Sequence, residues 1–428
     1  MVKASSGAHR DWSARNIYVL ALLTLIATFN YFDRSVLGLI LPLLKRDMQV
    51  SDTVIGLITG LVFSLMNGFV GLPVARLADS KSRRNIITAG LVFWSVMTSA
   101  TGFVVNIWQL ALTRLLMGVG EATSMAPSNS MLADLFSRAR RSFAVAILVS
   151  GNPLSSILFV PVAAWIAHVY GWRMAFIVAG LPGLFLGALF FLTVKEPIRG
   201  DADARIVPPI TGNWWSTVKF LLGSRSYVLL LVGATLLSTN VSLSSWYASF
   251  FDRVFHLSMT QIGWIVGPGR GVGGLIAVIF GGFLVDYFGQ KDDRWRFRLP
   301  AVAAILAVPG MLVFLLADNL SWSVGGLVFA NLCSAATQGA AYAACSNLAK
   351  PRMRATSVAI FLVFVNIVGY SAGPSLAGWI SDLLQPQFGA QSLRYALLIG
   401  AAAAGLGGLC YWGAGRTVAA DMRRALED

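Results

Sequence analysis

Two charged residues stand side by side inside the first long apolar stretch of the sequence. The stretch reads LIATFNYFDRSVLGLILP (25–42) and holds Asp33 and Arg34 near its middle. An ionised side chain at bilayer depth costs roughly 2.5–3.5 kcal/mol, so such residues usually face a bundle interior or a water-filled path. When an acid beside a guanidinium group takes up a proton, the cation loses its partner and becomes free to bind an anion. We therefore expect Asp33 and Arg34 to face a cavity.

A second apolar stretch, 107–136, carries another acid and another base. Arg114 and Glu121 lie about two helical turns apart, which places them on one face of a helix. The helical rise puts Asp33 at a depth between them, so two acids and two bases converge. In one interpretation Asp33 and Glu121 bind protons, with Arg34 and Arg114 as their partners and as substrate contacts. In the other, the four charges form a buried network that only holds helices together.

Further polar residues occur within the apolar segments, although a span that only faces lipid does not need them. We interpret them as lining a central cavity, although hydrogen bonds between helices explain any single one of them equally well. Asn30 and Tyr31 adjoin the first charge pair and are candidate substrate contacts. The candidate cavity-lining residues in the second half of the chain are Asn240, Trp246, Tyr247, Gln338, Tyr342, Asn366 and Tyr370.

One glycine-rich string resembles a phosphate-binding turn. GPGRGVGG (267–274) has the glycine spacing of a dinucleotide-binding motif, but that motif requires a strand before it and a helix after it. The string lies instead inside an apolar segment, where small residues favour close packing of helices. Arg270 within it is a candidate anion contact.

The composition indicates that these residues are positioned by membrane-spanning helices. The chain has 428 residues, of which 56% are hydrophobic and 12% charged. Soluble domains carry about 25% charged residues. A span needs about 20 largely apolar residues, and about twelve segments meet that requirement. They lie near 16–44, 53–78, 85–105, 107–136, 142–168, 172–194, 226–251, 259–288, 299–317, 321–349, 355–383 and 392–414.

The net charge of +14 follows from where the basic residues lie. With the N-terminus inside, most lysines and arginines fall in the cytoplasmic loops, as the positive-inside rule requires. We therefore expect both termini to be cytoplasmic. This excess of basic residues in the cytoplasmic loops explains the positive charge without a nucleic-acid partner. The first apolar segment is too long for the core of a signal peptide and is predicted to be a retained span.

The chain repeats itself. LKRDMQVSDTVIGLITG (44–60) aligns with FDRVFHLSMTQIGWIVG (251–267), so that Arg46 matches Arg253 and Ser51 matches Ser258. Later segments of the two halves match at nearly the same spacing. This pattern predicts two six-helix bundles from one duplication, related by an axis along the membrane normal.

The expected domains follow from this repeat. They are an N-terminal bundle over 1–194, a linker over 195–225, a C-terminal bundle over 226–414 and a cytoplasmic tail over 415–428. The linker ends in NWWSTVKFLLG, whose pattern suits an interfacial amphipathic helix. A plain linker is an equally good interpretation.

Two short loops carry the first family resemblance. GLPVARLADSKSRRN and GGFLVDYFGQKDDRWR each place an acid before a basic run. Both resemble the signature loop of the major facilitator superfamily, the first with Ala75, Ser80 and Ser82 departing from the pattern. The resemblance implies an all-α membrane protein with twelve transmembrane helices in two pseudo-symmetric bundles. It also implies a cytoplasmic latch, whereas the basic runs alone are explained by the positive-inside rule. The latch residues would be Asp79, Arg83, Arg84, Asp134, Asp286 and Lys291.

A closer resemblance rests on four strings. NYFDR, GVGEATSMAPSNSMLADLF, GWRMAF and KEPIRG resemble the Spinster group of that superfamily. The likeness covers the first half well and implies a bacterial homologue in the inner (plasma) membrane. Eukaryotic Spinsters export sphingosine 1-phosphate or lysophospholipids. The resemblance therefore implies a lysolipid-like substrate, with Asp33 and Glu121 as protonation sites.

We expect a monomeric secondary-active transporter that works by alternating access, with protons, membrane lipids and a small-molecule or lipid substrate as its partners. A symporter of small organic anions such as sugar acids is the alternative. A membrane-embedded transferase would need clustered His, Ser–His pairs or metal ligands, and the scattered Cys333, Cys345, Cys410 and three histidines supply none. We thus expect no enzymatic activity, cofactor or metal. A channel or receptor fits a duplicated architecture poorly.

Overall fold

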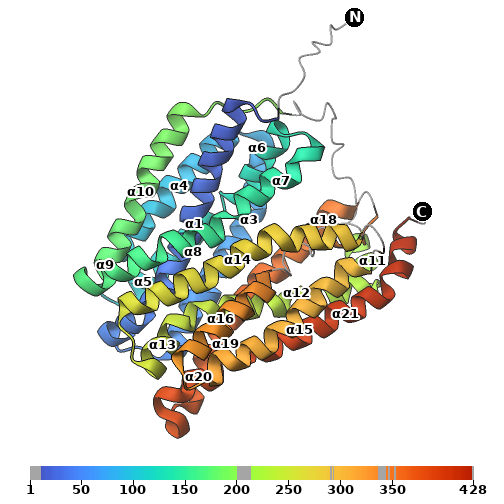
Figure 1. Cartoon of the computed structure of the whole chain (residues 1–428). Coiled ribbons are helices and arrows are strands. Elements are labelled where there is room, and N and C mark those ends of the chain that lie inside the picture. The colour runs from blue at the N-terminus through green and yellow to red at the C-terminus, as the bar shows by residue number, and fades with distance from the viewer. Residues whose placement is uncertain are drawn as a thin grey trace, which may run out of the picture.

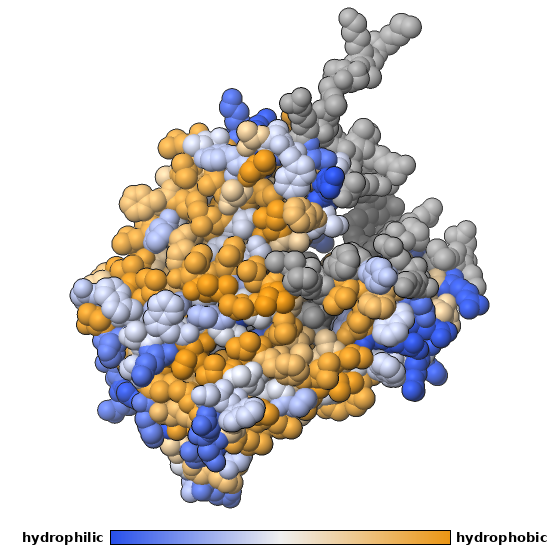
Figure 2. Space-filling model, viewed as in Figure 1, coloured by the Kyte–Doolittle hydropathy of each residue, from blue (hydrophilic) through white to orange (hydrophobic). Residues whose placement is uncertain are grey.

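The computed structural model describes residues 11–199, 214–289, 292, 294–335, 344–345, 348–350 and 353–426. This part of the chain is helical and contains no strand. The expected spans fall on single helices or on consecutive helices that continue one another, except that 336–343 and 346–347 of the span at 321–349 lie outside the described residues. Seven of the described helical stretches are long and apolar enough by themselves to cross a membrane. Figure 2 shows the matching surface, with apolar side chains over the middle of the molecule and polar ones gathered at its ends.

The first half contains the helices α1 to α10. α1 and α10 cross as single long helices, whereas the second, fourth and fifth spans are each divided. The bounds are α1 Ala14–Met48, α2 Asp52–Leu57, a π-helical segment η1 Ile58–Val62, α3 Phe63–Ser80, α4 Arg83–Thr101, α5 Ile107–Glu121, α6 Met125–Leu135, α7 Arg138–Val149, α8 Gly151–Leu158, α9 Val160–Tyr170 and α10 Trp172–Thr193.

The second half runs from α11 to α21. Its bounds are α11 Trp214–Leu222, α12 Arg225–Ser242, η2 Leu243–Trp246, α13 Tyr247–Phe255, α14 Met259–Gly289, α15 Trp295–Leu316, α16 Leu320–Ala335, α18 Arg354–Val363, a π-helical η4 Phe364–Gly369, α19 Tyr370–Phe388, η5 Gly389–Gln391, α20 Ser392–Ala396 and α21 Ile399–Leu426. The expected last span at 392–414 differs from this result. A short separate helix precedes α21, which continues through most of the expected tail, where Asp421 accepts from the backbone N–H of Ser226 at 2.8 Å.

The sequence repeat recurs in the backbone. α1 ends at Gln49 with φ 50°, and α13 ends at the matching His256 with φ 54°. These are the only non-glycine residues with positive φ in the described chain. Next along the chain, Ser51 Oγ accepts from the N–H of Val54, and Ser258 Oγ accepts from the N–H of Gln261. Both halves thus make the same left-handed helix end followed by the same serine cap.

The two halves pack against each other through three pairs of spans. Figure 1 shows the first half, in blue and green, beside the second half, in yellow to red. α14 packs against α8 and α9, α19 against α2 and η1, and α1 against α13. We call the end with the α1–α2, α13–α14 and α19–α20 connections the far end, because it lies opposite the end that carries both chain termini (Figure 1).

The prediction that the glycine-rich string serves close helix packing is confirmed. An added Cβ at Gly267 would come within 2.6 Å of the Ser156 carbonyl oxygen. One at Gly271 would come within 2.7 Å of the Pro153 carbonyl oxygen. Only glycine permits this approach of α14 to α8, and Arg270, which lies between the two glycines, lines the space between the halves.

Candidate functional site

A central cavity of about 160 Å³ lies between the two halves. Its lining comes from both halves and includes both π-helical segments, which are frequent at functional sites because they redirect side chains. Of the residues predicted from the sequence, the cavity is lined by Tyr31, Arg34, Arg114, Arg270, Asn366 and Tyr370.

Arg34 is the charged residue of α1 that faces the cavity. Its Nε donates to Glu121 Oε2 at 2.5 Å, which joins α1 to the end of α5. The Arg34 side chain is 33% exposed and that of Glu121 is fully buried. The guanidinium also lies 4.7 Å from the ring centre of Phe63, a favourable position for a cation. Arg34 can therefore meet a ligand on one side while Glu121 neutralises it on the other.

Asp33 does not line the cavity, so the expectation that both neighbours face it is wrong for the acid. Successive residues on a helix point about 100° apart, which sends Asp33 toward α4 when Arg34 faces inward. Asp33 is 1% exposed, and its polar neighbours on α4 are Thr98 and Trp94. Its Oδ1 has no hydrogen-bond partner in the described structure. A buried carboxylate with an unpaired oxygen is costly, and taking up a proton relieves that cost.

Arg114 lies between the two acids. It is 1% exposed, and both Glu121 and Asp33 interact with it electrostatically. Its Nη1 contacts Met117 Sδ at 3.2 Å, and its guanidinium lies 4.9 Å from the ring centre of Phe176. Its Nε and Nη2 have no hydrogen-bond partner among the described residues. The predicted convergence of two acids and two bases is therefore present, and Arg114 interacts electrostatically with both acids without a hydrogen bond to either in the described structure.

Several predicted cavity residues lie elsewhere. Asn30 is 1% exposed and does not line the cavity. Trp246 is fully buried, and its Nε1 donates to the Pro374 carbonyl oxygen at 3.1 Å. Asn240 and Tyr247 line a smaller side pocket that adjoins the central cavity. Gln338 and Tyr342 lie outside the described residues.

Sequence reasoning missed polar residues of the second and fifth spans that also line the cavity. Each is an isolated amide or hydroxyl within an apolar run, the same signal that identified Asn366, but weaker because no charge stands beside it. They are Thr59, Ser64, Asn67 and Asn152.

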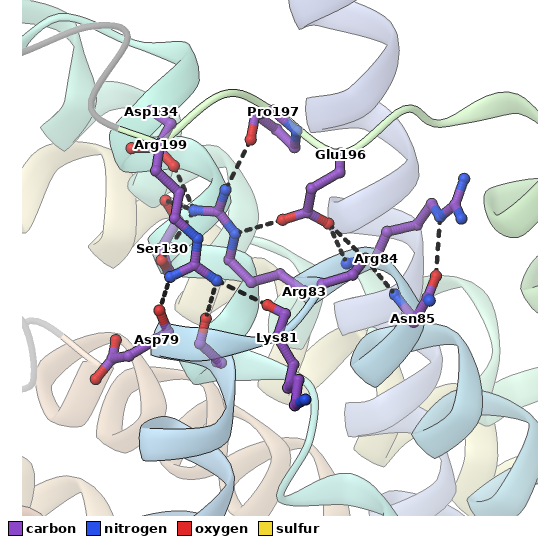
Figure 3. Close-up of polar contacts among 12 residues, drawn as sticks. Asp79, Lys81, Arg83, Arg84, Asn85, Ser130, Asp134, Glu196, Pro197 and Arg199 are labelled. Atoms are coloured by element: carbon purple, nitrogen blue, oxygen red, sulfur yellow. Dashed lines mark hydrogen bonds and ion pairs between the residues drawn. The ribbon is translucent and has the colours of Figure 1, made fainter.

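A second polar cluster lies at the end that carries the termini (Figure 3). Arg83, which is 1% exposed, forms ion pairs with Asp134 at the end of α6 and with Glu196, the latter at 2.7 Å. Its Nη2 also donates to the Pro197 carbonyl oxygen at 3.0 Å. Glu196 in turn accepts from the backbone N–H of Arg84 at 2.9 Å. The segment after α10 is thus fastened to the start of α4.

The predicted role of Asp79 in this cluster needs correction. Its carbonyl oxygen, rather than its carboxylate, accepts from Arg199 (Figure 3). Arg199 also binds the carbonyl oxygens of Ala78 and Lys81, at 2.8 and 2.7 Å. Arg199 therefore caps the unpaired carbonyls at the C-terminus of α3. Glu196 and Arg199, which make these charged contacts, both belong to the string KEPIRG. In the second copy of the loop, the Asp286 side chain and Lys291 lie outside the described residues.

The Glu196 contacts should stabilise the protein at neutral pH. Burial raises the pKa of Glu196, but hydrogen bonds from the Arg84 backbone, Arg83 and Ser82 outweigh it and hold the pKa below its usual value. Their contribution is therefore complete above about pH 4.3 and is lost as the pH falls through the lowered pKa. Glu196→Gln should lower the thermal unfolding midpoint by a few degrees at pH 7, since a charged hydrogen bond contributes about 1.5–3 kcal/mol and this carboxylate is partly screened by solvent.

The matched control is Lys195→Gln, which changes one charge at the neighbouring exposed position. Thermal unfolding of the purified protein is measured at pH 7 and at pH 3.5. The difference between the two variants should shrink in acid. Equal midpoints at pH 7 would show that the cluster contributes nothing to stability.

A third cluster joins the two halves at the far end. Asp52, 1% exposed at the start of α2, accepts two hydrogen bonds from Arg253 at 2.6 Å each and one from Ser381 at 2.7 Å. Lys45 of its own half contacts it at 2.5 Å. Asp382 accepts from the backbone N–H of Asp52 at 3.1 Å, which caps α2 across the interface.

The repeated segments thus contact each other. Arg46 binds Asp252 at 2.7 Å, while its counterpart Arg253 binds Asp52. The backbones approach closely, since a Cβ at Gly378 would lie 2.2 Å from the Asp52 carbonyl oxygen. In this structure the far end is closed by ion pairs that cross between the halves.

Two helical halves, a charged cavity between them and ion pairs that close one end define the class of the molecule: a membrane transporter of the major facilitator type. The family model of the Major Facilitator Superfamily matches residues 23–374. The chain belongs to this superfamily, and its two helix bundles are the two halves of that fold.

Within the superfamily the chain is similar to Spinster proteins. It is 28% identical to human "Protein spinster homolog 1" over 445 residues, covering 96% of this chain and 83% of that one. It is 30% identical over 408 residues to an "MFS-type efflux pump" of Mycolicibacterium smegmatis, covering 95% and 93%. The fold matches a bacterial homologue of the human lysosomal transporter Spinster, solved inward-facing and unoccupied, with a TM-score of 0.83 at 24% identity over 96% and 98% of the two chains.

Proposed function

We propose that this transporter is proton-coupled and moves an anionic or amphiphilic small molecule by alternating access. The observation that carries the proposal is the Arg34–Glu121 pair at the cavity wall, backed by Arg114 and by the buried Asp33. Protonation of Glu121 releases Arg34 to bind an anion. When Asp33 is protonated, Glu121 is the remaining charged acid that interacts with Arg114. Two acids that compete for two bases in this way link proton uptake to anion binding.

The substrate class follows from the cavity and from the relatives. A lysolipid-like amphiphile agrees with the similarity to Spinster proteins. The volume of about 160 Å³ is also compatible with the second candidate, a small organic anion such as a sugar acid. Sites that enclose a drug-sized ligand measure about 300–1,000 Å³, so in this conformation the cavity suits a head group or a small acid.

We further propose that the protein acts as a monomer in the bacterial inner membrane with both termini in the cytoplasm. The basic loops at the end that carries the termini support this orientation. The far end would then face outward, and the bundles over 1–194 and 226–414 would rock about the cavity. A ligand shifts the equilibrium between the two states only if its contacts differ between them.

Flux into proteoliposomes tests the proposal. A panel of lysolipids and sugar acids is offered with and without an imposed pH gradient, and protein-free vesicles provide the control. One class should cross faster with the protein, and the gradient should drive it beyond equilibrium until a protonophore is added. A flux that ignores the gradient would contradict proton coupling. Failure of every panel member would contradict the proposed substrate classes.

A further inference from the structure

A side pocket of about 30 Å³ extends from the central cavity into the second half. It shares Val241, Ser244 and Arg270 with the cavity, so the two spaces adjoin. A space of about 10–15 Å³ holds one water molecule, so this pocket has room for the oxygen atoms of one acid group. Its wall is polar for a membrane interior and includes Asn240, Tyr247, Asn331 and Ser334.

Arg270 supplies the charge of this pocket. It is a half-buried residue of α14, and its electrostatic neighbours are the hydroxyl groups of Tyr247 and Tyr370. No acid of the described chain pairs with it, whereas Arg34 is held by Glu121. A guanidinium at bilayer depth without a counter-charge is costly, and an anion from outside the chain removes that cost.

The pocket also has unused hydrogen-bonding capacity. Asn240 is 3% exposed, and its Nδ2 donates to Ser334 Oγ at 3.3 Å. Its Oδ1 has no partner in the described structure and is buried against Gly400 of α21. The Tyr247 hydroxyl has only a long contact of 3.9 Å with Met311 Sδ, which leaves it free to donate to an anion. A ligand that contacts the Tyr247 hydroxyl needs an anionic oxygen, and a rotation of the Asn240 amide into the pocket would let its oxygen accept from an adjacent O–H or N–H group.

We propose that the side pocket binds the acid group of the transported molecule, with Arg270 as its counter-charge and Asn240 as acceptor for an adjacent hydroxyl. This inference rests on the proposed function and narrows its substrate to hydroxylated anions. The glycerol phosphate of a lysolipid and the carboxylate of a sugar acid share this chemistry. The acid group would sit in the second half while the rest of the molecule contacts Arg34 in the first.

Binding to the purified protein is measured by ligand-induced thermal stabilisation with four probes. Lysophosphatidylglycerol and gluconate carry the hydroxylated anion from the lipid source and the free-acid source. Monoacylglycerol lacks the charge, and hexanoate lacks the hydroxyl. Arg270→Gln should lower the affinity for the tighter-binding hydroxylated anion at least about tenfold. Arg270→Lys should recover part of that affinity. Asn240→Leu should reduce the preference for gluconate over hexanoate.

The matched control is Arg173→Gln, which removes one positive charge from a half-exposed ion pair with Asp47 within the first half. It should bind all four probes as the wild type does. The inference is overturned if Arg270→Gln binds the anions normally, or if the wild type binds neither hydroxylated anion. If Arg270→Gln lowered the affinity for monoacylglycerol as much as that for the anions, and Arg270→Lys recovered neither, Arg270 would have only a structural role. A wild type that binds but transports nothing contradicts the proposed function and leaves the pocket intact. Transport unaffected by Arg270→Gln contradicts the pocket alone.

Discussion

Asp33→Asn is expected to abolish uptake driven by a pH gradient while leaving exchange of substrate for substrate in place. Asparagine is close to a permanently protonated Asp33, so one of the two acids that compete for Arg114 is lost at every pH. Asp33 and Glu121 then no longer compete for Arg114, and proton uptake is no longer linked to anion binding in the cavity. Exchange needs no net proton movement and should persist. Gradient-driven uptake in proteoliposomes should fall to the level of protein-free vesicles, which is the largest functional effect that we expect from a single substitution.

Glu121→Gln provides the comparison. It frees Arg34 directly, so it should also end the gradient dependence, and the double variant should be no worse than either single one if the acids share one proton. Asp47→Asn is the control, because it removes a half-exposed acid from a pair that lies outside the cavity. An Asp33→Asn protein with a normal dependence of uptake on pH would reduce Asp33 to a packing residue.

Asp52→Asn is expected to open the far end. The substitution leaves Arg253 and Lys45 without their acid in a site where Asp52 is 1% exposed. Removing one partner of a buried ion pair costs about 3–5 kcal/mol, and this cost falls on the closed state, which alone brings Arg253 to Asp52. Since about 1.4 kcal/mol changes an equilibrium tenfold, the ratio of closed to open molecules should fall by about a hundredfold or more.

Spin labels at Val105 and Leu383, both exposed at the far end and in different halves, report this change. Their distance distribution should move to longer values in Asp52→Asn and stay unchanged in Asp47→Asn, whose ion pair lies within one half. An unchanged distribution in Asp52→Asn would mean that packing, such as the Gly378 contact, closes this end without the charges.

The fold was accessible from the sequence because each span must satisfy a simple length and hydropathy requirement. The repeat was accessible because Gln49 and His256 belong to segments that still resemble each other. The division of α20 from α21 was missed, since hydropathy does not register a short turn between apolar residues. The end of the last helix was missed for a different reason, because it depends on contacts such as that of Asp421 with Ser226.

The site was only partly predictable. That charges converge follows from helical periodicity, which relates Arg114 to Glu121. Which of two adjacent residues faces the cavity depends on the rotation of α1, and this rotation is set by packing between distant segments. The same limit explains why Asp52 was overlooked: its partner Arg253 is remote in sequence, and an acid at a loop end carries no local signal. Glu196 belongs to the string KEPIRG, which resembles the Spinster group, but its role depends on its contact with Arg83.

We expect the two halves to open the cavity alternately, at one end and then at the other. The most direct measurement records two distances in one reconstituted preparation, Val105 to Leu383 at the far end and Ser80 to Arg423 at the end that carries the termini, where all four positions are exposed. The distances are followed as the pH is lowered and as a transported panel member is added. Alternating access predicts reciprocal changes, so that one distance lengthens whenever the other shortens. Distances that lengthen together, or a single one that moves alone, would contradict it.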